Sequence, residues 1–334
     1  MSILQQSVTT ALDLARKLSK ASPRATAYVY DLINRRVFTD LYWHERMLAD
    51  KVRIEAYQKG IQATIKPGDV VIDLGTGSGI LAFMAARSGA KHVYAIDHSD
   101  FIEIAREIAA RNGFENITFV SQNSRDFVPP EPADILLHEQ LGHAIFGENM
   151  VMNLLDLKRR ALKPTGRIIP GAFELFIEPV SLKDEYRIPA IWEMDHLGLK
   201  LEFLRDYPPL QKYMGRNHRI RQVKNFEVEQ LLCDPAPLFS FDMNDISGED
   251  DIRRRYELSR PLVKSGVLDG FCVYFRGSFD AATSFETAPS CRQTNWDNLL
   301  IRTPKRQCRA GDQLNYSLEL GDLEKPRTWE ITFS

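Results

Sequence analysis

The sequence predicts an α/β protein: a doubly wound, mostly parallel Rossmann-like sheet, followed by an antiparallel, β-barrel-like domain with an inserted helical arm. From Pro67 to Pro170, apolar strand-like runs alternate with helical segments, which is typical of a parallel sheet covered by helices. After Pro170 this alternation stops and β-rich segments follow one another. At 334 residues the chain has room for two ordinary domains.

Three regions follow from this pattern. We predict N-terminal helices in residues 1–40, because apolar side chains recur there at helical spacing. The α/β domain is expected in 41–170 and the β domain in 171–334. Within the β domain, a leucine-rich stretch of mixed pattern at about 188–215 predicts an arm rather than a strand.

The individual elements are predicted from apolar runs, alternation and glycine or proline boundaries. In the α/β domain, strands are expected at 70–73, 92–97, 116–120, 133–138 and 166–169, and helices at 79–88, 100–112 and 148–162. In the β domain, strands are expected at 173–180, 225–232, 270–279, 312–320 and 328–333. An uninterrupted helix is also expected across 42–53.

Composition limits the kind of function. The net charge is −2, without the basic excess of a general nucleic-acid binder, so no nucleic-acid partner is expected. No stretch approaches the roughly 20 apolar residues of a membrane span, so no membrane partner is expected either. The cysteines form no CxxC pair, which predicts free thiols and a cytoplasmic location. The histidines show no metal-ligand spacing, so no metal is expected. The cysteines are Cys233, Cys272, Cys291 and Cys308.

A strand, a glycine-rich turn and a helix follow one another at Val70–Ile80. Glycines stand at alternate positions, Gly75, Gly77 and Gly79, so a ligand can approach the main chain closely next to a helix N-terminus. The spacing G-x-G-x-G differs from the G-x-G-x-x-G of dinucleotide-binding proteins. The turn is therefore expected to bind a nucleoside-type ligand other than a dinucleotide. Two alternatives remain: a tight turn that binds no ligand, and the cofactor site of a nicotinamide dehydrogenase.

Two acids accompany this turn at the ends of neighbouring strands. Asp73 ends the first strand, and Asp97 ends the second, where a carboxylate can bind a ribose diol. The order of acid, glycine-rich turn, helix, strand and second acid resembles the binding half of class I S-adenosylmethionine-dependent methyltransferases.

Two further carboxylates follow the fourth strand. Glu139 stands at the strand end, on the edge where ligands bind in such sheets, and Glu148 stands nine residues later. Neighbouring carboxylates repel unless a cation lies between them, and a planar guanidinium matches two carboxylates well. For Glu148 the alternative is an acid at a helix N-terminus.

Three motifs in order make the sequence similar to the protein arginine N-methyltransferases. The family's double-E loop, E-x8-E with a methionine two residues later, matches Glu139, Glu148 and Met150. Its helix motif H-E-x-M-L-x-D-x-x-R matches residues 44–53 in full, and its T-H-W element corresponds to 294–296. The resemblance runs from about residue 40 to the C-terminus and includes the place of the family's dimerisation arm, which implies a homodimer.

The resemblance implies roles in binding S-adenosylmethionine. Arg53 would pair with the carboxylate of its methionine part, His44 would lie nearby, and Asp73, Gly75 and Gly77 would hold the methionine and ribose. Asp97 would bind the ribose hydroxyls in place of the family's usual glutamate. Ser124 stands where the family has a glutamate against the adenine, so Asn123 and Asp126 are alternative contacts.

The resemblance also implies a substrate site. Glu139 and Glu148 would bind the guanidinium and concentrate its positive charge away from the attacking nitrogen, and one of them would accept the proton. The substrate pocket would be formed by Met47, Asp50, Met150, Asn295 and Trp296.

Two departures from the family pattern leave the substrate open. Asn295 replaces the histidine of T-H-W and cannot carry a proton at neutral pH. Asn34 and Arg35 do not match the aromatic motif that begins the family's N-terminal helix. The sequence therefore predicts methylation of arginine, either in a protein or peptide or as free L-arginine. The alternatives are another small guanidino or amine metabolite, and a catalytically silent dimeric binding protein.

Overall fold

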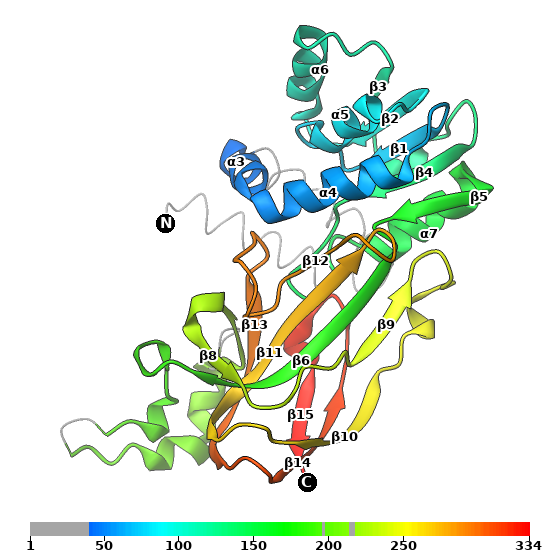
Figure 1. Cartoon of the computed structure of the whole chain (residues 1–334). Coiled ribbons are helices and arrows are strands. Elements are labelled where there is room, and N and C mark those ends of the chain that lie inside the picture. Colours follow the sequence, from blue (N-terminus) through cyan, green and yellow to red (C-terminus); the bar gives the residue numbers. More distant parts are fainter. Residues whose placement is uncertain (1–39, 196–197, 214–217) are drawn as a thin grey trace. The chain divides into compact units, whose positions relative to one another are not determined.

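The computed structural model describes residues 40–195, 198–213 and 218–334 (Figure 1). The helices predicted in the first 39 residues, with Asn34 and Arg35, lie outside the described residues. So do parts of the predicted arm. Within the described residues, no helix is both long enough and apolar enough to cross a membrane.

The chain forms two compact units, and the divisions between them fall after Asp50, after Glu139, after Gly166 and within the helices α4 (Lys51–Thr64) and α7 (Met150–Ala161). The first unit comprises residues up to 50, 61–139 and 157–166, and the second comprises 51–60, 140–156 and 167–334. The predicted division at residues 40 and 170 stays a prediction.

A five-stranded sheet forms the core of the first unit, in the order β3-β2-β1-β4-β5. The pairs β2–β3, β1–β2 and β1–β4 are parallel. The strand order reverses between β1 and β4, and ligands bind at such a switch point, beyond the carboxyl ends of the strands. The strands are β1 (Val70–Leu74), β2 (His92–Asp97), β3 (Ile117–Ser121), β4 (Ala133–His138) and β5 (Leu162–Ile169).

The five strands predicted for this sheet are confirmed, each to within a few residues. So are its three helices, of which α5 (Ile80–Arg87) packs against β1 and β2, and α6 (Ile102–Arg111) packs against β3. All residues of β1 are buried, and all except Asp73 are apolar, because both faces of a parallel sheet are covered.

The prediction of one uninterrupted helix across 42–53 is wrong. Helix α3 (Leu41–Ala49) ends at Asp50, whose extended backbone (φ −74°, ψ 90°) separates it from α4. Asp40 caps the start of α3 by accepting the N–H of Tyr42 at 3.0 Å. Asp50 and Arg53 are therefore not neighbours on one helix.

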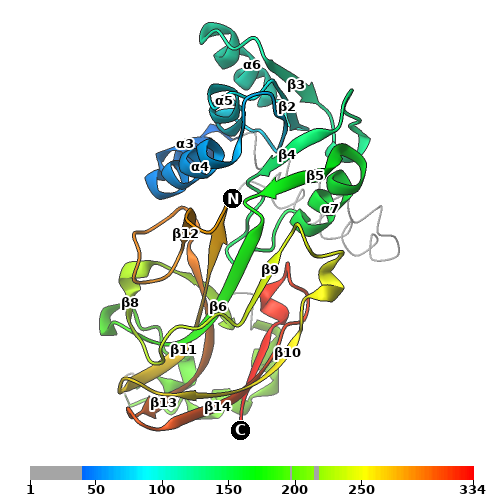
Figure 2. The same cartoon turned by 45° about the vertical axis from the view of Figure 1, so that its right-hand side comes forward.

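Two antiparallel sheets build most of the second unit, which confirms the predicted fold class (Figure 2). The larger has the order β7-β13-β11-β6-β8, with β12 added to β11 and β9 added to β6, and the smaller has the order β10-β14-β15. Strands β6 and β11 pair along nine residues and are nearly free of exposed side chains. The ten strands are β6 (Ala172–Leu182), β7 (Ile220–Val223), β8 (Val228–Leu231), β9 (Phe239–Asp242), β10 (Arg255–Pro261), β11 (Gly266–Ser278), β12 (Ser284–Glu286), β13 (Asn298–Cys308), β14 (Gln313–Glu319) and β15 (Glu330–Phe333).

Five of these strands, β7, β9, β10, β12 and β13, were not predicted. Four have at most seven residues, and β10 exposes every second side chain, so these four show no long apolar run. Strand β13 is longer, but much of its second half is exposed. Between β6 and β7, the described part of the arm forms short 3₁₀ helices. The four cysteines are free thiols, as predicted.

Candidate active site

The glycine-rich turn joins β1 to α5. Gly75, Gly77 and Gly79 all have left-handed backbones, with φ of 73°, 52° and 84°. Glycine adopts this region without the steric cost that a Cβ brings. The N–H groups of Gly75 and Thr76 both donate to the carbonyl of Ile96, at 2.9 and 3.0 Å, which fixes the turn beside the end of β2.

Asp73 is fully buried at the end of β1. Its Oδ2 accepts a hydrogen bond from the hydroxyl of Thr76 at 2.6 Å. Burial raises the pKa of Asp73 to about 7, although the hydrogen bond from Thr76 opposes this change. The side chain of Asp73 therefore fixes the turn through Thr76. Its charge changes near neutral pH, because its pKa is about 7.

Asp97 connects the end of β2 to the same turn. Its Oδ2 accepts the N–H of Gly77 and its Oδ1 accepts the N–H of Ser99, both at 2.8 Å. Each carboxylate oxygen has a second lone pair and can accept another hydrogen bond. The predicted contact of Asp97 with ribose hydroxyls is chemically possible in this arrangement and stays a prediction.

Three buried polar atoms at the ends of β1 and β2 have no hydrogen-bond partner within the described residues. They are Asp73 Oδ1, His98 Nε2 and Ser99 Oγ. A buried polar group without a partner costs roughly 1–3 kcal/mol. A ligand with hydroxyl and amino groups would satisfy such atoms, so these residues fit the nucleoside part of S-adenosylmethionine.

His44 lies over the glycine-rich turn. Its ring is buried and stacks on Phe101, with 3.7 Å between ring centroids and 13° between planes. A Cβ placed on Gly77 would lie 3.1 Å from Cε1 of His44. The structure thus brings His44 to the turn, while its predicted place near the cofactor stays a prediction. Met47 lies on the same helix and is half-buried.

Arg53 lies in the part of α4 that belongs to the second unit. Its side chain is 6% exposed, and its guanidinium lies 5.7 Å from the ring centroid of Trp296, in a cation–π contact. Trp296 itself stacks on Phe285 at 5.2 Å. The predicted contact of Arg53 with a cofactor carboxylate stays a prediction.

Asn123 and Ser124 form the start of a short 3₁₀ helix after β3. Oδ1 of Asn123 accepts the N–H of Arg125 at 3.0 Å, and the carbonyl of Ser124 accepts a hydrogen bond from Arg160 at 3.1 Å. These contacts fix the segment at the carboxyl end of β3. Contact of either side chain with adenine stays a prediction.

The glutamate loop, residues 139–149, joins β4 to α7. Glu139 directly follows β4, and Glu148 stands two residues before α7. Glu148 has a φ of 56°, so it is not part of the helix but lies next to its N-terminus, and the interpretation as an acid at a helix N-terminus stays an alternative. Among the described residues, positive φ at non-glycine positions occurs at Ile145, Glu148 and Asn149 alone, all in this loop. Such strain, of order 1–3 kcal/mol each, persists where the surroundings enforce it and is concentrated at functional sites.

Side chains of the second unit hold the glutamate loop by its main chain. The indole N–H of Trp296 donates to the carbonyl of Leu141 at 3.0 Å, and Glu324 accepts the N–H of Asn149 at 2.7 Å. The side-chain amide of Asn153 donates to the carbonyl of Glu148 at 2.9 Å. Trp296, predicted to line the substrate pocket, therefore also anchors the loop, and Met150 is buried at its end.

The segment that corresponds to T-H-W has an ordered turn. The hydroxyl of Thr294 donates to the carbonyl of Trp296 at 3.0 Å, and the half-buried Asn295 lies between these two residues. The turn fixes the indole that holds the glutamate loop. A substrate contact of Asn295 stays a prediction.

Comparison with known proteins supports the interpretation of the chain as an S-adenosylmethionine-dependent methyltransferase. The family model "Methyltransferase domain" matches residues 65–207. The chain is 28% identical to protein arginine N-methyltransferase 6 of Xenopus tropicalis, over 79% of the chain and 78% of that protein. It is 27% identical to the probable protein arginine N-methyltransferase 6.1 of Oryza sativa subsp. indica, over 95% of the chain and 85% of that protein.

Over most of its length, the chain is similar to protein arginine N-methyltransferases.

Solved structures of arginine methyltransferases share the fold. The Trypanosoma brucei PRMT1 enzyme-prozyme heterotetrameric complex with AdoHcy is 23% identical, with a TM-score of 0.75 over 89% of this chain and 95% of that chain. Arabidopsis thaliana protein arginine methyltransferase 10 is 23% identical, with a TM-score of 0.73 over 89% of this chain and 93% of that chain.

Several residues beside the glycine-rich turn and the glutamate loop were not predicted. Thr76, Ser99 and Phe101 stand within a few residues of the ends of β1 and β2. Their place after the two strands could have indicated that they belong to the site. Glu324 offered no signal, because it stands 175 residues from its partner in the loop.

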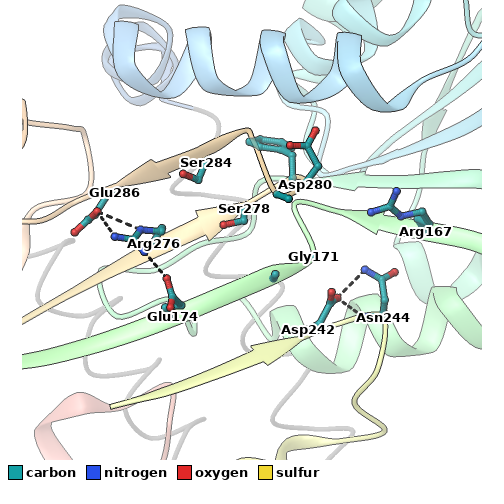
Figure 3. A pocket seen from close by; sticks show the side chains of 13 residues that line it. Arg167, Gly171, Glu174, Asp242, Asn244, Arg276, Ser278, Asp280, Ser284 and Glu286 are labelled. Carbon is teal, nitrogen blue, oxygen red and sulfur yellow. Dashed lines mark hydrogen bonds and ion pairs between the residues drawn. The ribbon is translucent and has the colours of Figure 1, made fainter. Parts of the chain in front are cut away.

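A polar pocket of about 660 Å³ was also not predicted (Figure 3). It lies in the second unit at the ends of β6, β9 and β11. Arg276 bridges Glu174 and Glu286 at 2.7 and 2.9 Å on one side, and Asp280 and Arg167 lie on the other. Within the described residues, no three histidine, cysteine or acidic side chains gather as metal ligands.

Proposed function

We propose that this protein transfers a methyl group from S-adenosylmethionine to a guanidino nitrogen of arginine in a protein or peptide. The observation that carries the proposal is the glutamate loop. It follows the switch-point strand β4, and it keeps Glu148 and Asn149 in left-handed conformations by contacts to the main chain. The names of the relatives and the unpartnered polar atoms beside the glycine-rich turn support it.

The bound cofactor would supply a sulfonium methyl group, which forms the new C–N bond as its C–S bond breaks and the nitrogen loses a proton. The residues Asp73, Gly75, Gly77 and Asp97 would bind its ribose and methionine parts, and Ser99 offers an unpartnered hydroxyl there. Arg53 would pair with the carboxylate. Because the chain has little covalent work to do, alignment of the two reactants is its main contribution.

Glu139 and Glu148 would bind the guanidinium through two of its nitrogens. Positive charge is then concentrated on the bound nitrogens, and the third nitrogen becomes the better nucleophile. One of the two carboxylates would accept the proton, directly or through water, because Asn295 cannot do so at neutral pH. Met47 and Met150 would narrow the pocket, which favours a monomethyl or asymmetric dimethyl product over the symmetric one.

Labelled S-adenosylmethionine tests the proposal with an Arg-Gly-rich peptide and free L-arginine as separate acceptors. We expect label on the peptide, a loss of about 10²–10⁴-fold in Glu139→Gln and Glu148→Gln, and no loss in the exposed control Glu115→Gln. Label on free arginine alone would instead indicate a small-molecule enzyme. Cofactor binding without label on either acceptor would contradict the proposal and favour a silent binding protein.

We also propose a homodimer that forms through the arm. Large apolar side chains are exposed on its described part, among them Leu199 at 58% and Phe203 at 60%. Light scattering after size exclusion should show a dimer for the wild type and a monomer for Phe203→Glu, while a dimer in the variant would contradict the proposal. The free thiols further support a cytoplasmic location as a proposal.

A further inference from the structure

His143 lies in the first half of the glutamate loop and contacts two separate segments of the second unit. Its Nδ1 lies 2.8 Å from the carbonyl oxygen of Asp297. Its Nε2 lies 2.7 Å from the side-chain nitrogen of Gln222. The ring is half-buried, whereas Gln222 is exposed.

The two partners match the two nitrogens of the ring, one as a donor and the other as an acceptor. The side-chain nitrogen of Gln222 can only donate, so Nε2 of His143 accepts. The carbonyl of Asp297 can only accept, so Nδ1 carries the proton and donates. In this arrangement His143 can receive one hydrogen bond and give another, and both contacts restrict the orientation of the ring.

Both partners belong to one edge of the large sheet. Gln222 lies in β7 and is paired with Leu299 of β13, and Asp297 directly precedes β13. The carboxylate of Asp297 is bound in turn by Lys224 of the segment that follows β7. Because paired strands hold these groups, the edge is a rigid support for the imidazole.

The glutamate loop needs such support because its backbone is strained. Ile145, a β-branched residue, has a φ of 69°, which is unfavourable for any residue other than glycine. The carbonyl of Gly142 accepts the N–H of Ile145 at 3.2 Å, and Gly142 N–H donates back at 2.9 Å. His143 lies inside this small bridge, between the anchor of Leu141 and the strained residue.

We propose that His143 is a positioning residue for Glu148: by joining the loop to the β7–β13 edge, it holds the loop in the conformation in which Glu148 meets the guanidinium. The inference rests on the proposed function for its effect on catalysis. It makes a separate prediction for the loop itself, because a loop released from this edge exchanges its amide hydrogens faster.

Three substitutions separate the two contacts. His143→Leu removes both hydrogen bonds. His143→Asn keeps a donor near Nδ1 and retains the contact with Asp297, whereas His143→Gln keeps a group near Nε2 and retains the contact with Gln222. His92→Leu serves as a control, because His92 makes a surface contact with Thr118 in the first unit.

Steady-state kinetics on the peptide and calorimetric binding of S-adenosylmethionine give the first readout. In His143→Leu we expect kcat to fall about 100-fold, as for a small misplacement of a catalytic group, with cofactor affinity unchanged within about threefold. His143→Asn should recover at least about a tenth of the wild-type kcat. His92→Leu should match the wild type.

A double-mutant cycle with Glu148→Gln tests whether His143 acts through Glu148. If it does, His143→Leu lowers kcat in the wild type but has little further effect in Glu148→Gln. An equal fall in both backgrounds, or no fall in either, would overturn the proposal.

Amide hydrogen exchange of the peptide covering 139–150 gives a readout that is independent of activity. We expect at least about tenfold faster exchange in His143→Leu, with the rest of the second unit unchanged. Unchanged exchange in the loop would overturn the positioning role even if activity falls. A wild type that methylates no arginine substrate would refute the proposed function, while the exchange experiment would still decide whether His143 holds the loop.

Discussion

Replacement of Asp73 by asparagine is expected to remove a large pH dependence of stability. Asparagine imitates the neutral carboxyl group and keeps an acceptor for Thr76. Burial raises the pKa of Asp73 from 3.8 to about 7 in the folded protein. A carboxyl group with a raised pKa holds its proton more tightly in the folded chain, so its favourable contribution is complete below 3.8 and is lost as the pH rises through about 7.

The size of this loss follows from the pKa change. At 1.36 kcal/mol for each unit of pKa, a change of about 3 corresponds to about 4 kcal/mol in the free energy of unfolding. Of this, about 2 kcal/mol falls between pH 5 and pH 7, a range in which many proteins can be measured. The stability of Asp73→Asn relative to the wild type should therefore increase as the pH rises across this range.

Urea unfolding at pH 5, 6, 7 and 8 without cofactor measures the difference between variant and wild type. We expect Asp73→Asn to be the more stable protein at pH 8, with an advantage that shrinks steadily toward pH 5. Asp126→Asn, at an exposed aspartate of the same unit, is the control and should show no such trend. A constant difference between Asp73→Asn and the wild type from pH 5 to 8 would refute the reasoning.

Three further predictions concern the turn and the loop. Gly77→Ala should lower the melting temperature more than Gly113→Ala, because both have positive φ but only the first would bring a Cβ within 3.1 Å of a histidine ring; equal losses in a thermal scan would contradict this. Glu324→Ala should cost roughly 1–3 kcal/mol of unfolding free energy, because it leaves the N–H of Asn149 without an acceptor, while Glu324→Gln keeps one and should be near neutral in urea titrations. Trp296→Phe should lower the methylation rate and speed hydrogen exchange in the glutamate loop, because it removes the donor to a loop carbonyl; unchanged exchange would argue against the anchor.

The first unit could be predicted from the sequence because its determinants are local. A buried parallel strand such as β1 is a continuous apolar run, and the glycines that follow it reveal the turn. The break at Asp50 could not be predicted, because residues 41–64 have helical character on both sides of it. The positive φ of Glu148 had no signal in the sequence either, because no glycine stands there and the contacts beside it come from Asn153 and from the distant Glu324.

The second unit was harder to predict because its determinants are distant in sequence. Strand β13 pairs with β7 and β11 over separations that no local pattern reports, and short edge strands lack a long apolar run. The same holds for the anchors of the glutamate loop. Glu324 and Gln222 are ordinary polar residues in the sequence, and only the fold gives them a partner.

Most side chains that hold the glutamate loop bind its main-chain carbonyl or N–H groups. Trp296, Asn153 and Glu324 bind a carbonyl or an N–H group of the loop, so they do not depend on which side chains the loop presents. Positions between Glu139 and Glu148 other than His143 can therefore diverge between relatives, or be randomised in a directed-evolution library, without the loss of these three attachments. Substrate preference can change on a loop whose course stays the same.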